Sequence, residues 1–315
     1  MLSFDVLERN APPDASWLSV LRALFVRSEW LLRPMLEMLE EPMLPAYFAD
    51  FTDIWNVMRA IRPEVDEATR VDEAIRGLQF HSIEFLKLQI QFAKKGEYRS
   101  SDFEAVYKEV YNAPDVMKRY LDGLLLTYVA WPNHYRLLQY YRRNYLAKGP
   151  YGNCLEIGPG HGWLALEQLR ASPTNRLLGL DISPSSVQYT NSVLKAAGIE
   201  PARFQICEHN AMTGIDAAKP FDRVVIAEVI EHLEKPDELL RLAVSHSHKQ
   251  TLFFITTVVN IEAVDHIYLF RELHEIPDLL RSCGLSVIDQ LDLPLKMNLQ
   301  LPKPAYEVAV IARPS

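Results

Sequence analysis

The residues best suited to chemistry are three closely spaced glycines and a more distant aspartate. The apolar run Cys154–Ile157 leads into Gly158-Pro159-Gly160-His161-Gly162, and apolar residues at helical spacing follow from Trp163. Glycines adopt backbone angles closed to other residues and let a ligand approach the main chain. Asp181 ends the next apolar run, where a carboxylate can accept hydrogen bonds from both hydroxyls of a ribose. These residues predict a nucleoside-binding site.

Three features of the loop narrow the choice of nucleoside. Trp163 occupies the position where a dinucleotide site needs a third glycine for close helix–strand packing. No Lys followed by Ser or Thr comes after the loop, which excludes a nucleoside triphosphate loop. Glu156 would repel a pyrophosphate, whereas it suits a ligand that carries an ammonium group and no phosphate. We therefore expect a positively charged nucleoside.

The elements that must position these residues divide the chain into two halves. From about residue 14 to 147 the apolar residues recur at helical spacing, which predicts five to seven helices and no strand. Pro114 and Pro132 are typical of first helical turns. After residue 149, short apolar runs alternate with helical stretches, which predicts a parallel sheet with right-handed crossovers. We therefore expect two domains, an all-α domain at residues 1–148 and an α/β domain at residues 149–315.

Seven strands are expected in the second half, in a doubly wound Rossmann-like sheet. They are Cys154–Ile157, Arg176–Leu180, Arg203–Cys207, Arg223–Ala227, Thr251–Thr256, Leu285–Ile288 and Tyr306–Ala312. No clear helix joins the last two, so we expect them to pair antiparallel.

Composition limits the classes of function. The formal net charge of −8 disfavours a broad nucleic-acid-binding face. No apolar run approaches the roughly 20 residues of a membrane helix, and no secretory signal is visible, so a cytoplasmic protein is expected. Three widely spaced cysteines form neither a disulfide framework nor a zinc pattern.

The second half resembles the class I S-adenosylmethionine (SAM)-dependent methyltransferases, because residues 156–162 are similar to motif I of that family. The resemblance implies SAM as the cofactor. It implies that Asp181 binds the ribose, that Ile182 packs on the adenine, and that Asn210 replaces the family's acid near the adenine amino group. The segment from Glu228 to Leu233 is similar to the family's segment beside the transferable group. The expected cofactor residues are Glu156, Gly158, Gly160, Gly162, Asp181, Ile182, Asn210, Ala211 and Glu228.

The helical half is expected to supply a lid and the catalytic side chains. In the family, helices just before motif I close over the sulfonium, and the face of Trp131 can attract that cation. Asn133 is expected to hold an amine or carboxylate, with Tyr128 and Tyr135 as further candidates. The alternative is that these aromatic residues only pack in a helical core.

The second half contributes candidates with more than one interpretation. His232 and His266 are candidate general bases. Together with Glu228 and Glu231 they resemble the metal ligands of small-RNA 2′-O-methyltransferases. The same stretch also occurs in metal-free relatives, and this chain is acidic without a basic cluster, so no metal is predicted.

Three functions remain open. The leading hypothesis is an enzyme of specialised metabolism that transfers a methyl group from SAM to a small molecule. A weaker resemblance to the azetidine-2-carboxylate synthases implies a SAM cyclase, in which the amine of SAM attacks its own γ-carbon and methylthioadenosine is released. The third is a SAM-binding partner subunit without catalysis. A small-molecule substrate, or SAM alone, is the expected partner, without nucleic acid or membrane, and a homodimer is left open.

Overall fold

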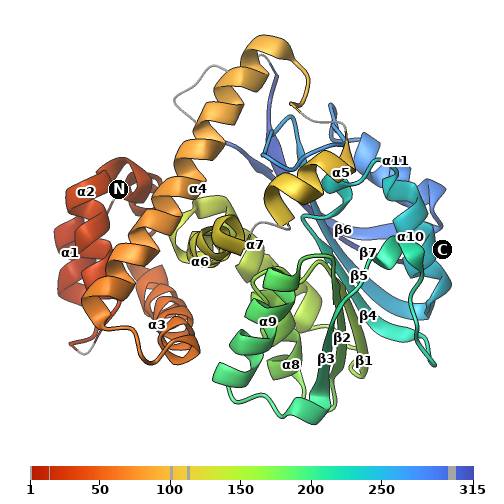
Figure 1. Cartoon of the computed structure of the whole chain (residues 1–315), viewed down its shortest axis with the longest axis horizontal. Helices are drawn as coiled ribbons and strands as arrows, with labels where there is room; N and C mark the ends of the chain where they lie inside the picture. Colours follow the sequence, from red (N-terminus) through yellow and green to blue (C-terminus); the bar gives the residue numbers. More distant parts are fainter. Residues whose placement is uncertain (1, 14, 100–101, 112–113, 297–302) are drawn as a thin grey trace. The chain divides into compact units, whose positions relative to one another are not determined.

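The structure is a computed structural model that describes residues 2–13, 15–99, 102–111, 114–296 and 303–315. The chain forms two compact units, each of which is discontinuous in sequence. Unit 1 comprises Met1–Ile83 and Lys118–Leu138, and unit 2 comprises Glu84–Met117 and Gln139–Ser315. The long helix α4 and the helix α6 each contribute to both units (Figure 1).

Unit 1 is helical throughout its described residues. Its elements are α1 (Phe4–Asn10), α2 (Leu18–Met38), η1 (Glu41–Met43), α3 (Leu44–Ile61), the first part of α4 (Glu67–Lys95), and most of α6 (Pro114–Ala130) and α7 (Pro132–Tyr140). Pro114 and Pro132 begin their helices, as predicted. Fully buried aromatic rings, among them Trp17, Tyr47 and Trp55, form the core. The helices α4 and α6 approach closely at two glycines, since a Cβ on Gly123 would lie 2.5 Å from the carbonyl oxygen of Gly77.

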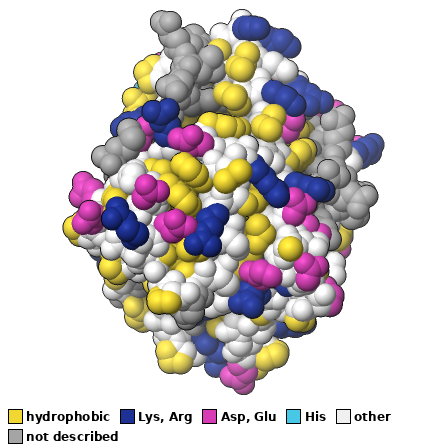
Figure 2. All heavy atoms as spheres, turned by 90° about the vertical axis from the view of Figure 1, so that its left-hand side faces the viewer, with side chains coloured by type: hydrophobic (Ala, Val, Ile, Leu, Met, Phe, Trp, Pro, Cys, Tyr) yellow, Lys and Arg dark blue, Asp and Glu magenta, His cyan; other side chains and the backbone are white. Residues whose placement is uncertain are grey.

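The surface of the first helices carries mixed side chains. Val26 and Trp30 of α2 are exposed, and Figure 2 shows hydrophobic groups scattered among basic and acidic ones on one face of the molecule. Positive and negative side chains are interspersed on that face. Isolated exposed hydrophobic residues of this kind are normal on protein surfaces.

Unit 2 is built around a seven-stranded sheet in the order β3-β2-β1-β4-β5-β7-β6. The strands are β1 (Asn153–Ile157), β2 (Arg176–Asp181), β3 (Phe204–Glu208), β4 (Phe221–Ala227), β5 (Ser247–Val259), β6 (Leu285–Pro294) and β7 (Tyr306–Pro314). The first five pair in parallel, and β7 is antiparallel to both of its neighbours. The predicted α/β fold, the seven strands and the antiparallel final pair are confirmed. The strand order reverses between β1 and β4, and ligands bind beyond the carboxyl ends of strands at such a switch point.

Helices cover both faces of this sheet. Figure 1 shows α8 (Trp163–Ala171) and α9 (Pro184–Ala196) on one side, and α10 (Pro236–Ser245) and α11 (Glu275–Ser282) on the other. The short helical turns of this unit are η3 (Tyr141–Leu146), η4 (Pro201–Arg203), η5 (Ala211–Thr213) and η6 (Ile230–His232). Apolar residues of β1, β4 and β5 pack against α10 and α11 in one buried cluster. This packing fixes the carboxyl ends of the parallel strands, where the site residues lie.

The division into units differs from the boundary expected at residue 148. The end of α4, α5 (Phe103–Val106) and η2 (Tyr107–Tyr111) belong to unit 2. These segments bond to the loop after β5: Tyr98 Oη donates to the carbonyl of Ile261 (2.6 Å), and Tyr111 Oη donates to Asp265 Oδ2 (2.9 Å). These contacts join residues far apart in sequence, so periodicity did not reveal them.

Two further observations bear on the expectations from composition. Among the described residues, no helix is both long enough and apolar enough to cross a membrane. Cys154, Cys207 and Cys283 are free thiols.

Candidate functional site

The glycine loop after β1 depends on backbone angles that favour glycine. Gly158, Gly160 and Gly162 have φ values of 70°, 54° and 73°, which other residues adopt only with strain. A Cβ on Gly158 would also lie 2.6 Å from Cγ2 of Val229, and one on Gly162 would lie 2.9 Å from Thr190. The loop therefore brings bare main chain to the switch point between β1 and β4.

Asp181 lies at the end of β2 and is tied to this loop. Its Oδ2 accepts a hydrogen bond from Gly160 N (3.1 Å), and its Oδ1 accepts one from Ser183 N (2.9 Å). Burial raises the pKa of its carboxyl to about 6, against the opposing effect of these bonds. Each carboxylate oxygen can accept more than one hydrogen bond. The side chain is therefore oriented and keeps acceptor capacity for a pair of ribose hydroxyls.

Glu156 precedes the loop and is fully enclosed. Its Oε2 accepts a hydrogen bond from Gln168 Nε2 of α8 (2.8 Å). Burial raises the pKa of this carboxyl to about 8. A cationic group brought next to Glu156 would favour its ionised form, as any close opposite charge does.

The remaining expected cofactor residues follow β2 and β3. Ile182 is half-buried, and Ala211 is buried at the start of η5. Asn210 is exposed and its Oδ1 accepts a hydrogen bond from Met212 N (3.0 Å), which caps η5. The amide oxygen expected near an adenine amino group thus already accepts one bond and retains a second lone pair.

Glu228 stands where β4 ends, in an unusual backbone conformation. Its φ is 52°, and its N–H donates to Thr256 Oγ1 (3.0 Å) of β5. Left-handed backbone in a residue with a Cβ is costly and recurs at functional sites. Burial raises the pKa of this carboxyl, and burial together with the charge of Glu228 raises that of Glu307 on β7. Buried acidic side chains therefore lie together at the carboxyl ends of β4 and β5.

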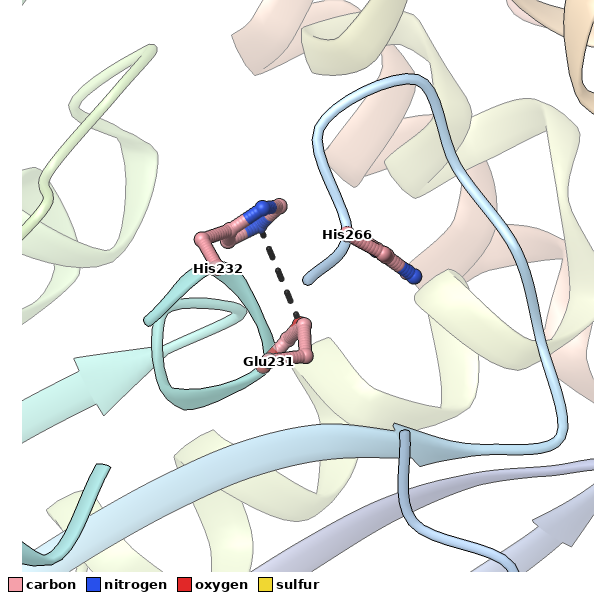
Figure 3. A group of neighbouring side chains, drawn as sticks. All are labelled: Glu231, His232 and His266. Atoms are coloured by element: carbon pink, nitrogen blue, oxygen red, sulfur yellow. Dashed lines mark ion pairs between the residues drawn. The ribbon is translucent and has the colours of Figure 1, made fainter. Parts of the chain in front are cut away.

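A group of two histidines and two acids lies directly beyond Glu228. Figure 3 shows Glu231 and His232 on the turn η6 and His266 on the loop after β5. Glu231 Oε1 is 3.9 Å from His232 Nε2, and the two imidazole centroids are 5.0 Å apart. The fourth member, Asp265, approaches His232 Nδ1 with Oδ2 at 3.6 Å. We call these four residues the Glu231 cluster.

Burial and mutual contacts set the charges in the Glu231 cluster. Burial, strengthened by the charge of Glu228, raises the pKa of Glu231 well above its ordinary value. Burial lowers the pKa of His266 to about 4, so this imidazole is neutral near pH 7. Burial also acts to raise the pKa of Asp265, but the two imidazoles and the Tyr111 hydroxyl outweigh it and lower that pKa.

The predicted catalytic residues fall in both units. His232 belongs to unit 2, beside the expected cofactor residues, whereas Tyr128, Trp131, Asn133 and Tyr135 belong to unit 1. In unit 1 the half-buried Trp131 ring lies 5.1 Å from that of His81 and 5.0 Å from that of His134. Tyr135 is buried with its ring edge-on to Tyr47 at 5.7 Å. The ligand roles of these four residues stay predictions.

Sequence reasoning missed Asp265 and Tyr111 as members of the site. The adjacent acid and histidine at positions 265 and 266, just after a buried strand, were the signal that was available. Tyr111 carried no comparable signal, because its hydrogen bond to Asp265 joins segments far apart in the chain.

The residues present fit SAM. Glycines with left-handed backbone angles leave the main chain open to a nucleoside, Asp181 retains acceptors for its hydroxyls, and buried carboxyl groups complement a cation. With the strand order described above, they define a class I SAM-dependent enzyme.

Comparison with known proteins agrees with this class. Residues 129–288, more than half of the chain, match the model of the family described as methyltransferase domain, and the chain belongs to that family. Its cofactor is SAM. No curated protein matches the chain.

Several solved structures share the fold. The cyclase SpnF superposes with a TM-score of 0.51 at 16% identity, covering 65% of this chain and 97% of its own. The mitomycin 7-O-methyltransferase MmcR gives 0.52 at 16% identity, covering 74% and 68%. The O-methyltransferase NcsB1 of neocarzinostatin biosynthesis, in complex with SAM and a naphthoic acid, gives 0.52 at 15% identity, covering 76% and 70%.

Proposed function

We propose that this enzyme transfers the methyl group of SAM to a small-molecule acceptor in specialised metabolism. The observation that carries the proposal is the pairing of Asp181 with Gly160 at the switch point, next to the buried carboxyl groups of Glu156 and Glu228. This arrangement suits a cationic nucleoside, because carboxyl groups at this place would repel a phosphate when ionised. Membership in the methyltransferase domain family supports it.

The residues of the chain have a limited task in such a reaction. SAM supplies a methyl carbon made electrophilic by the attached sulfonium. The protein must hold an acceptor atom in line with that carbon and keep water out. His232 carries the proposed role of general base for an acceptor that arrives protonated, since its Nδ1 is held by the Asp265 carbonyl at 2.9 Å and its Nε2 remains to take a proton.

Two observations support a small organic acceptor. The chain is acidic, with a formal net charge of −8, which opposes binding of a polyanion. The similar structures include enzymes whose names give mitomycin and a naphthoic acid as the molecules handled. We extend that class of acceptor, a compact aromatic natural product, to this enzyme as part of the proposal.

The test incubates the purified protein with SAM alone and with panels of phenols, aromatic carboxylic acids and amines. Formation of S-adenosylhomocysteine only in the presence of an acceptor is the expected result, and Asp181→Ala serves as the control with impaired cofactor binding. Absence of this product across the panels, from protein that binds SAM in calorimetry, would contradict methyl transfer to these classes.

A second candidate, intramolecular cyclisation of SAM to azetidine-2-carboxylate, is favoured by the aromatic residues at the junction of α6 and α7. Tyr128, Trp131 and His134 have neighbouring rings there and are half-buried. This chemistry needs an aromatic wall for the sulfonium and polar groups that fold back the aminobutyrate arm. Methylthioadenosine and azetidine-2-carboxylate formed together from SAM alone, faster than without the protein, would establish it and exclude acceptor-dependent transfer as the main reaction. Homoserine lactone as the second product would exclude the cyclisation.

A further inference from the structure

The Glu231 cluster presents three ligand atoms to one point. One atom from each of Glu231, His232 and His266 lies within 4.8 Å of the other two. Figure 3 shows Glu231 and His232 facing each other on η6, with His266 beside them on the loop after β5. Two imidazole nitrogens and a carboxylate oxygen are a common donor set for a divalent transition metal.

The Glu231 carboxyl has an unsatisfied oxygen. Its Oε2 accepts a hydrogen bond from Thr257 Oγ1 (2.8 Å), whereas its Oε1 is buried and has no partner other than the facing carboxyl of Glu228. The residue as a whole is 0% exposed. Buried polar atoms without a partner are costly, so such an atom points to a missing ligand.

Both histidines are oriented as metal ligands are. His232 Nδ1 lies 2.9 Å from the carbonyl oxygen of Asp265, and His266 Nδ1 lies 2.9 Å from that of Ile261. A carbonyl only accepts, so each Nδ1 carries the proton and each Nε2 of the neutral ring keeps a lone pair. Ligating histidines ordinarily donate their other N–H to a carbonyl or carboxylate, which fixes the tautomer and the ring.

Further groups surround this point. Asp265 Oδ2 accepts a hydrogen bond from Tyr111 (2.9 Å), while its Oδ1 is buried without a hydrogen-bond partner. Glu228 Oε1 is also buried, and the Glu228 carboxyl faces that of Glu231. The surroundings are therefore rich in negative charge when ionised, and among the described side chains that face the cluster no lysine or arginine forms an ion pair with Glu231 or Asp265.

We propose that Glu231, His232 and His266 bind one divalent first-row transition metal ion. The two imidazoles favour Mn²⁺, Fe²⁺, Co²⁺ or Zn²⁺ over Mg²⁺ and Ca²⁺, which prefer oxygen ligands alone. Three protein ligands leave positions for water or for an oxygen of a substrate. Val229, two residues before Glu231, lies against the glycine loop at Gly158, so the segment that carries two of the three ligands also touches that loop.

This site departs from the sequence-based prediction that no metal binds. The negative overall charge and the absence of a basic cluster argue against an RNA substrate, but they do not argue against a metal held by Glu231 and two histidines. The ion would take the His232 Nε2 lone pair that the proposed general base uses, so the two roles exclude each other in one protein molecule. Ion binding is tested on the full chain without SAM or an acceptor, so its failure and that of methyl transfer are distinguishable.

The test uses the full-length protein after dialysis against a chelator. Titration with Mn²⁺ in a calorimeter, followed by electron paramagnetic resonance, is expected to give one site per chain, with much weaker binding of Mg²⁺. Glu231→Gln removes the anionic donor and His266→Asn removes an imidazole, so each is expected to lower the Mn²⁺ affinity by at least about 10–100-fold, the loss seen when even an outer-shell partner is removed. His246→Asn is the matched control, since that imidazole lies outside the cluster and bonds to Leu242 O.

A second measurement does not depend on variants that may misfold. Electron spin-echo modulation from imidazole nitrogen is expected in the Mn²⁺ complex of the unchanged protein. Absence of a site at millimolar Mn²⁺, Co²⁺ and Zn²⁺ would overturn the proposal. Unchanged affinity in Glu231→Gln and His266→Asn, with melting curves that show folded protein, would overturn it as well.

Discussion

The carboxylate of Asp181, at the end of β2, accepts a hydrogen bond from the backbone N–H of Gly160 in the loop after β1, with 3.1 Å between Oδ2 and N. The bond joins the two features that define the nucleoside site. It also keeps the carboxylate oriented before any ligand arrives, so that less order must be imposed on binding.

Replacement of Asp181 by alanine should weaken SAM binding by about 1.5–3 kcal/mol, the range for hydrogen bonds to a charged group. Calorimetric titration with SAM measures the effect. The exposed Asp216, changed to alanine, is the control and should bind SAM as the unchanged protein does. Equal affinities for Asp181→Ala and the unchanged protein would remove the ribose assignment.

Replacement of Gly158 by alanine should lower the free energy of unfolding by more than the cost of its left-handed backbone angle, because the added methyl group also meets a neighbour. Gly158 and Gly198 have φ values of 70° and 73°, but only a Cβ at 158 meets a neighbour, Val229 Cγ2 at 2.6 Å. We expect Gly158→Ala to cost about 1–3 kcal/mol of unfolding free energy beyond the cost of Gly198→Ala, because of overpacking. Denaturant unfolding measures both, and adding Val229→Ala should recover part of the difference.

The buried Glu156 should make stability depend on pH. Its pKa in the folded protein, about 8, lies above the ordinary value of 4.5. The folded state therefore holds this proton more tightly, and stability present below about pH 4.5 is lost as pH rises toward 8. Glu156→Gln should unfold with a free energy about 2–4 kcal/mol higher than the unchanged protein at pH 8, with little difference at pH 5.

Unfolding curves recorded between pH 5 and 8 check this. The exposed Glu200, changed to glutamine, is the matched control and should leave the pH dependence unaltered. Parallel pH profiles for Glu156→Gln and the unchanged protein would show that the carboxyl titrates normally.

The proposed contact of Trp131 with a sulfonium predicts a difference between two ligands. Trp131→Leu should weaken binding of SAM by about 0.5–2 kcal/mol through loss of the cation–π attraction. Binding of S-adenosylhomocysteine, whose sulfur is neutral, should change less. Trp30→Leu, at an exposed position of α2, is the control, and an equal loss for both ligands would instead indicate a packing role.

Much of the fold could be predicted because it depends on local patterns. The central strands β1 and β4 are largely buried and each contains a short apolar run, and their expected and observed bounds differ by one or two residues. At the edge of the sheet, the apolar pattern of the sequence predicted only part of a strand. The strand β6 continues through Asp289 to Pro294, beyond the expected end at Ile288, because an edge strand can include polar residues that face water.

The candidate site was predictable only in part, for a related reason. Gly158 and Asp181 follow successive strands, and parallel strands bring their carboxyl ends to one edge, so their proximity follows from the order of elements. The position of Asp265 beside His232 does not follow from the order of the strands. It depends on the loop after β5, which Tyr98 and Tyr111 hold by hydrogen bonds to Ile261 and Asp265.

The amino-acid sequence by itself therefore determined the sheet, the glycine loop and the class of cofactor, since these rest on residue types at short spacing. Only the tertiary structure decided which histidine lone pairs meet which carboxylate, because tautomer, burial and distance arise from contacts between segments remote in the chain. The division into two units was also not predictable from local patterns, since Tyr98 and Tyr111 of unit 2 bond to a loop more than 150 residues further along the chain.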